Sequence, residues 1–340
     1  MLVHISPSEI PVLLLFGLDP SWSRQEQDEV FKASYQLAEA ISSVGHPTTP
    51  ISVEHSDLRA VLGSYDPLEY IVFNWCEGLP GISHSEWIVT KYLEEMGFTF
   101  TGAGSGTLAL TQNKYRTKQV LDDFGIPTPG WKLFHLPSVR GWGRFPAIVK
   151  PVNEHCSEGI DSSSIVVTER ELEKKVRSVI ARFGHPALVE DFIDGRELHV
   201  SLWGNGTIDV LPPVEMDFSF FKDFRDRICS YEAKFIPDSV HYRNIGTVLP
   251  APLTEDELRN IRESCLAAYQ ALGCRDYARI DLRMKDGALY ILDVNPNSDI
   301  TMETSTIAAA EYAGYSYGEF GSWLVRMSAE RHPVWGNQPL

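Results

Sequence analysis

The amino-acid sequence predicts an α/β protein with a doubly wound N-terminal domain followed by two α+β units. A chain of 340 residues is too long for one small core and provides for about two or three packed units. Its first third alternates continuous apolar runs with segments of helical spacing, a pattern typical of a parallel sheet buried on both faces. A second series of helices and strands begins near Gln112, and the breaker Gly125–Pro129 ends its first helix.

The composition narrows the class of protein. Apolar residues make up 43% and charged residues 22% of the chain, as is usual for a globular cytosolic protein. The formal net charge of −16 argues against a nucleic-acid partner, because phosphate backbones require clustered lysine and arginine. The five cysteines are scattered without a CxxC pair, and the apolar run Pro11–Gly17 is too short to span a bilayer. We therefore expect a cytoplasmic protein with reduced thiols and no membrane partner.

The N-terminal domain is expected to cover residues 1–112. Its predicted elements are the strand Val12–Phe16, the helix Gln25–Val44, the strand Tyr70–Phe73, the helix Glu86–Met96 and the strand Thr99–Thr101. The closing loop Thr101–Gly106 (TGAGSG) matches neither the dinucleotide-binding nor the P-loop glycine pattern. A plain connection is therefore favoured there over a phosphate site.

The rest of the chain is divided into a central unit, 113–190, and a C-terminal unit, 191–335. The central unit is predicted to contain helices 113–124 and Glu169–Phe183 and strands Ala147–Lys150, Ile165–Val167 and Ala187–Val189. The C-terminal unit is predicted to contain the strand Glu197–Trp203, the irregular segment Asp217–Asp238, a helix from the capping box Thr254/Glu257 to Leu272, and a hairpin of Ala278–Met284 and Ala288–Val294.

This hairpin carries the most informative polar residues. Residues two apart on a strand share a face, so Arg279 and Asp281 point one way, and Asp293 and Asn295 likewise share a face. Buried carboxylates require a counter-charge, and Mg²⁺ suits two carboxylates because water and phosphate oxygens complete its shell. The alternative is the exposed face of an antiparallel sheet with an Arg–Asp salt bridge.

The register of the hairpin decides whether the two carboxylates meet. A two-residue turn at Asp286-Gly287 would place Asp281 opposite Leu292 and the two aspartates on opposite faces. A three-residue turn, Lys285–Gly287, would restore one shared face. The metal interpretation therefore predicts the longer turn.

Three further segments offer groups that suit a phosphate ester. Lys150 ends a buried strand next to the small-residue loop 153–159, where an ammonium and backbone N–H groups could meet phosphates, although Lys150 could also simply extend to solvent. The strand edge Glu190–Ile193 and the nearby Glu197 could bind an adenine edge and ribose hydroxyls. Lys234, in the irregular segment, could act as part of a mobile lid.

In their order and spacing these elements resemble the ATP-grasp superfamily, and within it the D-alanine–D-alanine ligase branch. The resemblance covers roughly residues 70–310 and rests on FPAIVKP, ALVEDFIDGRE, YEAKF and ARIDLR…YILDVNP. It implies a pre-ATP-grasp N-terminal domain and two subdomains that sandwich ATP. It also implies a ligase that activates a carboxylate as an acyl phosphate, joins it to an amine and releases ADP and phosphate.

The resemblance further implies a role for each matching residue. The catalytic residues would be Arg279, Lys234 and Ser157; the nucleotide would be held by Lys114, Lys150, Glu154, Ser157, Glu190, Asp191, Phe192, Ile193, Glu197 and Lys234; and Asp281, Asp293 and Asn295 would hold two Mg²⁺ ions, for which Mn²⁺ could substitute. The partners would be a small carboxylate and a small amine, and the family suggests a homodimer.

The sequence departs from the family mainly on the substrate side. Asp293 stands where glutamate is usual, Cys156 where a serine pair is usual, and the run Pro296–Thr301 lacks the Pro-Gly pair. The N-terminal His-Gly run is replaced by Phe73–Gly78, so Glu77 becomes a candidate substrate contact. Asp299 is a second candidate, or alternatively the cap of a helix over Thr301–Thr306.

These departures favour a ligase of other substrates over the D-alanine pair. Two alternatives remain open: a true D-alanine–D-alanine ligase, and a nucleotide-binding protein of this fold without ligase activity. The retention of Lys150, Arg279 and all three metal-ligand candidates argues against the second alternative.

Overall fold

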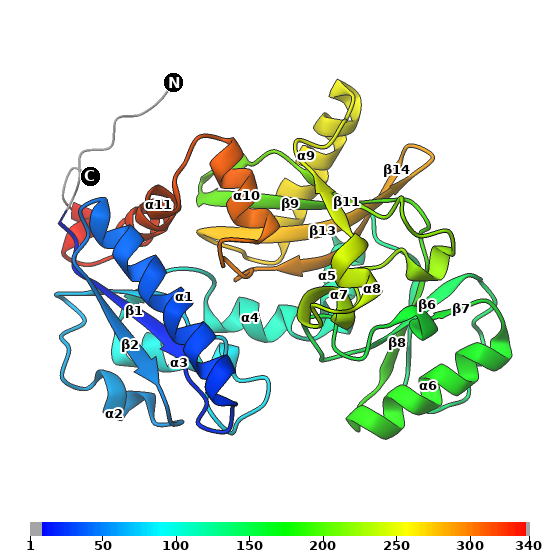
Figure 1. Ribbon diagram of the computed structural model, residues 1–340, viewed down its shortest axis with the longest axis horizontal. Coiled ribbons are helices and arrows are strands. Elements are labelled where there is room, and N and C mark those ends of the chain that lie inside the picture. The colour runs from blue at the N-terminus through cyan, green and yellow to red at the C-terminus, as the bar shows by residue number, and fades with distance from the viewer. Residues whose placement is uncertain (1–8, 338–340) are drawn as a thin grey trace.

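The computed structural model describes residues 9–337, so the first eight residues of the predicted domain 1–112 lie outside the described residues. Three sheets follow one another along the chain (Figure 1). The first is parallel, with the strand order β2 (Thr48–Val53), β1 (Val12–Gly17), β3 (Ile71–Trp75), β4 (Thr99–Phe100). Its helices are α1 (Arg24–Ser43), α2 (Leu58–Leu62), α3 (Glu86–Met96) and α4 (Ser105–Thr111).

Both faces of the first sheet are buried, as its continuous apolar runs predict. Leu13 and Leu15 of β1 pack with Val89 and Leu93 of α3. The opposite face of β1 packs against α1 and against a helix from the far end of the chain, α11 (Tyr317–Ala329), through Phe320 and Leu324. Figure 1 shows α11, in red, beside α1, in blue. The C-terminal segment, which also contains α10 (Ser305–Tyr312) and η3 (Trp335–Asn337), thus completes the N-terminal core.

The second sheet is antiparallel, in the order β5 (Trp131–Phe134), β8 (Ala187–Asp191), β6 (Ala147–Pro151), β7 (Ile165–Val166). One of its faces packs against α6 (Glu169–Phe183), through Val149 and Val189 on the strands and Leu172 and Val176 on the helix. The short helix η1 (Ser162–Ser164) precedes β7. The register pairs Ile148 with Glu190, so Lys150 and Glu190 lie on the face that α6 does not cover.

The third sheet has the order β12 (Gly246–Val248), β11 (Val214–Asp217), β9 (Arg196–Asn205), β13 (Tyr277–Lys285), β14 (Ala288–Asn295), and β10 (Thr207–Val210) pairs with β9. Its apolar face packs against α9 (Glu255–Ala271) and α5 (Lys114–Asp123). The segment Asp217–Asp238, expected to be irregular, contains two short helices, η2 (Phe224–Asp226) and α7 (Tyr231–Phe235), and α8 (Val240–Asn244) follows it. Leu121 of α5 belongs to this third core, although α5 was expected in the central unit.

The loop Thr101–Gly106 connects the N-terminal domain to the rest of the molecule. The Gly102 N–H donates to a carboxylate oxygen of Asp276 at 2.7 Å, and the Ala103 N–H donates to Asn297 Oδ1 at 2.9 Å. The loop therefore works as a structural connection, as its glycine pattern indicates. Among the described helices, none is long and apolar enough to cross a membrane.

Candidate active site

Three neighbouring strands place a set of charged residues on one face of the third sheet. The register pairs Asp281 of β13 with His199 of β9 and with Asp293 of β14. Two residues before Asp281, Arg279 pairs with Asn295 of β14. Two residues after Asp281, Arg283 pairs with Glu197 of β9. The opposite face carries apolar residues that pack on α9. The alternation predicted from the hairpin therefore extends over three strands.

The shared face of Asp281 and Asp293 arises differently from the sequence prediction. Lys285 pairs with Ala288, so the turn holds only Asp286 and Gly287, both at positive φ (49° and 78°) as a two-residue hairpin turn requires. A β-bulge compensates: Leu282 pairs with Ile291 while Asp281 pairs with Asp293, which leaves Leu292 as the extra residue. The prediction of a three-residue turn was wrong, because the strand rather than the turn supplies the extra residue.

The acidic groups of this face are matched by arginines. Arg279 donates to both oxygens of Asp281, at 2.7 and 3.0 Å, and Asn295 Nδ2 donates to Asp281 at 3.2 Å. Burial alone would raise the pKa of Asp281, but Arg279 and then His199 outweigh it and hold the pKa at about 2. Arg283 pairs with Glu197 at 2.7 Å and likewise keeps the pKa of that buried carboxyl well below its usual range. Both carboxylates are therefore charged at neutral pH.

Lysines enter the same pocket from the central part of the chain. Lys114 Nζ lies 2.7 Å from Asp293 Oδ2, and this contact raises the pKa of Lys114 against the effect of burial. Glu190 is 1% exposed and lies between two ammonium groups, Lys118 at 2.9 Å and Lys150 at 2.5 Å. Each cation is thus held by a carboxylate on another element, which fixes its position before any ligand arrives.

Two loops meet over this pocket. Cys156 and Ser157 have φ of 52° and 60°, and the Ser157 hydroxyl donates to the carbonyl of Cys229 at 2.7 Å. The Tyr231 N–H, at the start of α7, donates to the Ile160 carbonyl at 3.2 Å. The loop around Ser157 and the segment that carries Lys234 are therefore in contact. The remaining cavity is about 120 Å³, below the roughly 300 Å³ of typical small-molecule sites. A nucleotide would have to separate the two loops.

Most residues singled out from the sequence line this one pocket. They are Lys114, Lys150, Ser157, Glu190, Asp191, Phe192, Ile193, Glu197, Lys234, Arg279, Asp281, Asp293 and Asn295. Glu154 is not among the lining residues: its carboxylate lies 2.9 Å from His185 Nε2. The Asp191 side chain pairs with Arg144 at 2.7 Å.

The expected helix cap at Asp299 does not form. The first helix after β14 is α10, which begins at Ser305, whereas the predicted helix over Thr301–Thr306 would begin at Thr301. Asp299 Oδ1 instead accepts from the Thr301 N–H at 2.8 Å, which makes a local turn. Asp299 and Glu77 both line a second cleft next to the pocket.

Sequence reasoning missed several charged residues of the pocket, among them Arg283 and His199. The two-residue periodicity of a strand could have identified both. Arg283 lies two residues after Asp281, as Asp281 does after Arg279, and His199 lies two residues after Glu197. Lys118 carried no such signal. It is 1% exposed and its ammonium also donates to the carbonyls of Ile291 and Leu292, at 3.1 and 3.0 Å, where the bulge lies.

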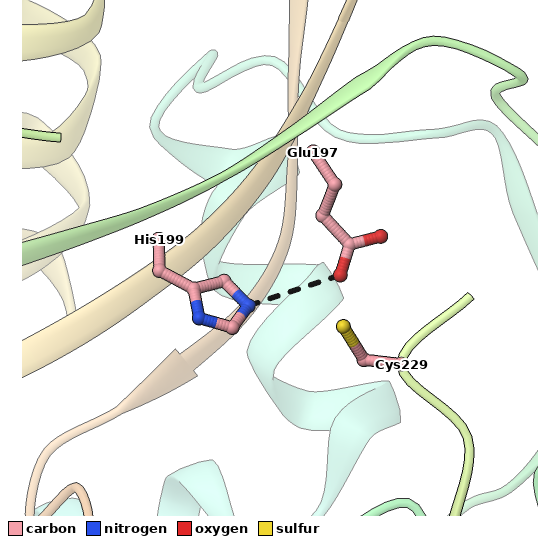
Figure 2. Close-up of side chains that lie close together, drawn as sticks. All are labelled: Glu197, His199 and Cys229. Carbon is pink, nitrogen blue, oxygen red and sulfur yellow. Dashed lines mark ion pairs between the residues drawn. The ribbon is translucent and has the colours of Figure 1, made fainter. Parts of the chain in front are cut away.

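Glu197, His199 and Cys229 form a compact group within this pocket (Figure 2). Their ligand-type atoms lie within 4.8 Å of one another, a spacing that suits a soft metal ion. However, the Glu197 carboxylate is already matched by Arg283, and burial followed by Glu197 raises the pKa of the Cys229 thiol well above its usual value. A neutral thiol beside a guanidinium favours a polar wall of the pocket over a metal centre.

Two antiparallel sheets enclose a pocket of lysines, arginines and carboxylates beside a parallel α/β domain, and this combination defines the ATP-grasp class. A family model described as D-ala D-ala ligase C-terminus matches residues 121–326. The D-alanine–D-alanine ligase of Desulforudis audaxviator is 28% identical over 312 residues, which are 90% of this chain and 95% of that ligase. The uncharacterized protein y4sG of Sinorhizobium fredii is 30% identical over 264 residues, 77% of this chain and 75% of its own.

A solved structure agrees with these relatives in fold. The crystal structure of the D-alanine–D-alanine ligase from Bacillus anthracis complexed with ATP matches with a TM-score of 0.73 and 18% identity, over 95% of this chain and 98% of that chain. The chain belongs to the D-alanine–D-alanine ligase family, and it is an ATP-dependent carboxylate–amine ligase.

Proposed function

We propose that the pocket transfers the γ-phosphoryl group of ATP to a substrate carboxylate and that an amine then attacks the acyl phosphate, releasing phosphate and forming an amide. The observation that carries this proposal is the charge arrangement. Four cations from four separate elements, Lys114, Lys150, Lys234 and Arg279, line one pocket, and carboxylates hold Lys114, Lys150 and Arg279 in place. Phosphoryl transfer depends mainly on positioning and on neutralising charge, which such a set provides.

The donor set on β13 and β14 fits Mg²⁺. Asp281 and Asp293 are opposite each other and ionised, and Asn295 adds a carboxamide oxygen, so all donors are the hard oxygens that Mg²⁺ or Mn²⁺ binds. We infer that these three residues hold the metal, whose charge when bound neutralises the phosphates. Before a metal ion binds, Lys114 holds the carboxylate of Asp293 and Arg279 holds that of Asp281.

The remaining lining residues suit the other parts of the reaction. The backbone of Asp191–Ile193 would meet the adenine edge, with Glu197 toward the ribose. Arg279 would stabilise the charge that develops on the reacting carboxylate. The contact between Ser157 and Cys229 would re-form over the bound nucleotide and keep water from the acyl phosphate.

The test is product analysis with purified protein, ATP and Mg²⁺ over pairs of amino acids, small acids and amines, with the D-alanine pair included. We expect ADP and phosphate in equal amounts, and a hydroxamate when hydroxylamine replaces the amine. Arg279→Lys keeps the charge but not the two-pronged geometry and should lower kcat by about a hundredfold. AMP and pyrophosphate as the products would contradict the acyl-phosphate route.

A further inference from the structure

A second cleft lies next to the pocket, where the N-terminal domain meets the C-terminal unit. Its volume is about 540 Å³, within the roughly 300–1,000 Å³ of sites for ligands of drug size. Its walls are the connection from β1 to α1, residues 75–83 after β3, and Asp299 and Thr301 from the segment after β14. Two units that are distant in sequence therefore build it together.

The ionisable residues that line the cleft are all acidic. Asp19, Glu77 and Asp299 line it, and none of the lining residues in the described part of the chain is lysine, arginine or histidine. Asp19 accepts from the N–H groups of Ser21 and Gly81, and the Ser21 contacts lower its pKa. No residue of the described range 9–337 forms an ion pair with Glu77 or Asp299. A fourth carboxylate, Glu86, lies behind the lining: the charge of Glu77 raises its pKa, and Glu86 and Glu77 both raise the pKa of Tyr277.

The rest of the wall is apolar. Phe16, Trp22 and Trp75 supply aromatic surface, and Leu18, Val30 and Ile82 supply aliphatic surface. Aromatic faces bind both hydrocarbon and cations, so they add to the preference that the carboxylates set. An anionic ligand would find no positive partner among these residues. Alanine as the substrate would fill little of the cleft, because its methyl group would leave most of the volume to water.

The cleft lies near the reacting end of the nucleotide pocket. Asp299 follows Asn295 by four residues along the chain. The charges of Glu77 and Asp299 raise the pKa of the Cys156 thiol, and the charge of Asp299 raises the pKa of Arg279. Cys156 and Arg279 both line the nucleotide pocket. A ligand in the cleft can therefore present its reactive group toward Arg279.

We propose that this cleft binds a cationic substrate, whose positive group pairs with Glu77 and Asp299 and whose apolar body lies on Trp22 and Trp75, so that the ligase acts on a basic amino acid or amine rather than on alanine. This inference rests on the ligase function proposed above and names the substrate class of that same site. A basic side chain supplies the cation that the walls lack, and its methylene groups cover aromatic surface.

Matched ligands separate charge from shape. Arginine and citrulline have nearly the same size but only arginine is positive, and lysine and norleucine form a second pair. Binding is measured by calorimetry for both L and D forms, with agmatine and putrescine as amines that lack a carboxylate. We expect at least one cation of this set to bind about tenfold or more tightly than its neutral counterpart. Equal affinity within the pairs, tighter binding of alanine, or no binding of any cation at millimolar concentration would overturn the proposal.

Variants assign the preference to this cleft. Glu77→Gln should remove most of the charge preference, and Asp299→Asn, which can still accept from the Thr301 N–H, should act in the same direction. Glu69→Gln removes a carboxylate from an exposed position of the same domain outside the cleft lining, and it should leave the preference unchanged. A preference that survives in both cleft variants would place the cation elsewhere and overturn the proposal.

The same ligands are assayed for ADP formation, which separates the two proposals. ADP formation with neutral pairs only, without selective binding of cations, would remove the substrate assignment and leave the ligase reaction standing. Selective binding of a cation without ADP formation from any pair would support the charge preference of the cleft and contradict the proposed reaction.

Discussion

Asp281 and Asp293 face each other from adjacent strands, and each has a basic partner, Arg279 or Lys114, within 2.7 Å. Two carboxylates this close would repel each other and raise the pKa of one of them if they were alone. The pKa of both is instead lowered, because the basic partners outweigh burial. The pair therefore stays doubly charged at neutral pH and ready for a divalent cation.

Asp293→Asn tests this pair with almost no change in shape. The substitution removes one of the two negative charges at the proposed metal site and leaves the ammonium of Lys114 without its carboxylate. We expect kcat to fall by about a hundredfold or more, equivalent to ~3 kcal/mol of transition-state stabilisation. Asp286→Asn is the matched control, since it removes a carboxylate at the hairpin turn and asparagine tolerates the positive φ there. Unchanged turnover in Asp293→Asn would exclude a metal role for this residue.

Glu77 and Glu86 give the free energy of unfolding a pH dependence. Burial followed by the charge of Asp299 raises the pKa of Glu77 to about 7, and burial followed by Glu77 raises that of Glu86 to about 8. A carboxyl group with a higher pKa in the folded protein binds more protons there than when unfolded. The free energy of unfolding therefore falls as the pH rises from the ordinary value, about 4.5, toward 8. The phenol of Tyr277 and the thiol of Cys156, which feel the same charges, have raised pKa values and stay neutral in this range.

The check is the melting temperature of the wild type against Glu77→Gln/Glu86→Gln between pH 6.5 and 8.5. Below this window His46 and His155, whose pKa desolvation lowers to about 4, act in the opposite direction. We expect the wild type to lose stability with rising pH and the double variant to lose less. Parallel curves would show that the two carboxyl groups do not titrate in this range.

The β13–β14 hairpin shows how far sequence reasoning reaches. Its strands, its two-sided pattern and the polar residues on one face follow from local alternation and could be predicted. The bulge at Leu292 could not, because the groups that hold it are distant in the sequence: Lys118 donates to the Ile291 carbonyl across 173 residues, and the Thr128 hydroxyl donates to the same oxygen at 2.8 Å. A register that depends on such a contact cannot be read from the hairpin alone.

The same limit explains the other misses. Residues 191–335 were assigned to the C-terminal unit, but α11, which lies within them, packs on the first sheet. The helix after Asp299 begins later than predicted, at Ser305, because Asp299 accepts from the Thr301 N–H and forms a local turn there. Family membership, by contrast, was predictable because four separate motifs occur in the right order.

Two single-residue deletions test the bulge. Deletion of Leu292 removes the extra residue and leaves Asp293 opposite Asp281, so we expect a folded protein with measurable ADP formation and a lower melting temperature. Deletion of Val294, two residues further on, moves Asn295 from the polar face into the apolar core. We expect that variant to lose turnover completely. Equal loss in both variants, with both still folded, would mean that the bulge does more than set the register.

Asp276 joins three segments that are distant in the sequence. It is fully buried and accepts from the N–H of Gly102, from Asn205 Nδ2 at 2.8 Å and from Arg331 at 2.5 Å. These partners belong to the interdomain connection, to the third sheet and to the C-terminal segment after α11. One carboxylate thereby fixes how the N-terminal domain sits against the sheet that carries the catalytic face.

Asp276→Asn should weaken this junction without a change in shape, and asparagine tolerates the φ of 62° at this position. Removing one partner of a buried ion pair leaves Arg331 uncompensated, so we expect the free energy of unfolding to drop by about 3 kcal/mol. Urea unfolding measures this, with Asp209→Asn on the exposed edge strand β10 as the control. A drop no larger than that of the control would contradict the role given to Asp276.

The position of α11 also has a consequence for the order of events during protein synthesis. The ribosome delivers β1 and α1 long before α11, although Val12, Leu14 and Phe16 of β1 share a core with Phe320 and Leu324. Until α11 emerges, only α1 covers that apolar surface, and the part that α11 will cover is available to chaperones or to other nascent chains. The parallel sheet is therefore made early but completed late, and the cleft that the N-terminal domain shares with the C-terminal unit can form only after Thr301 has been synthesised.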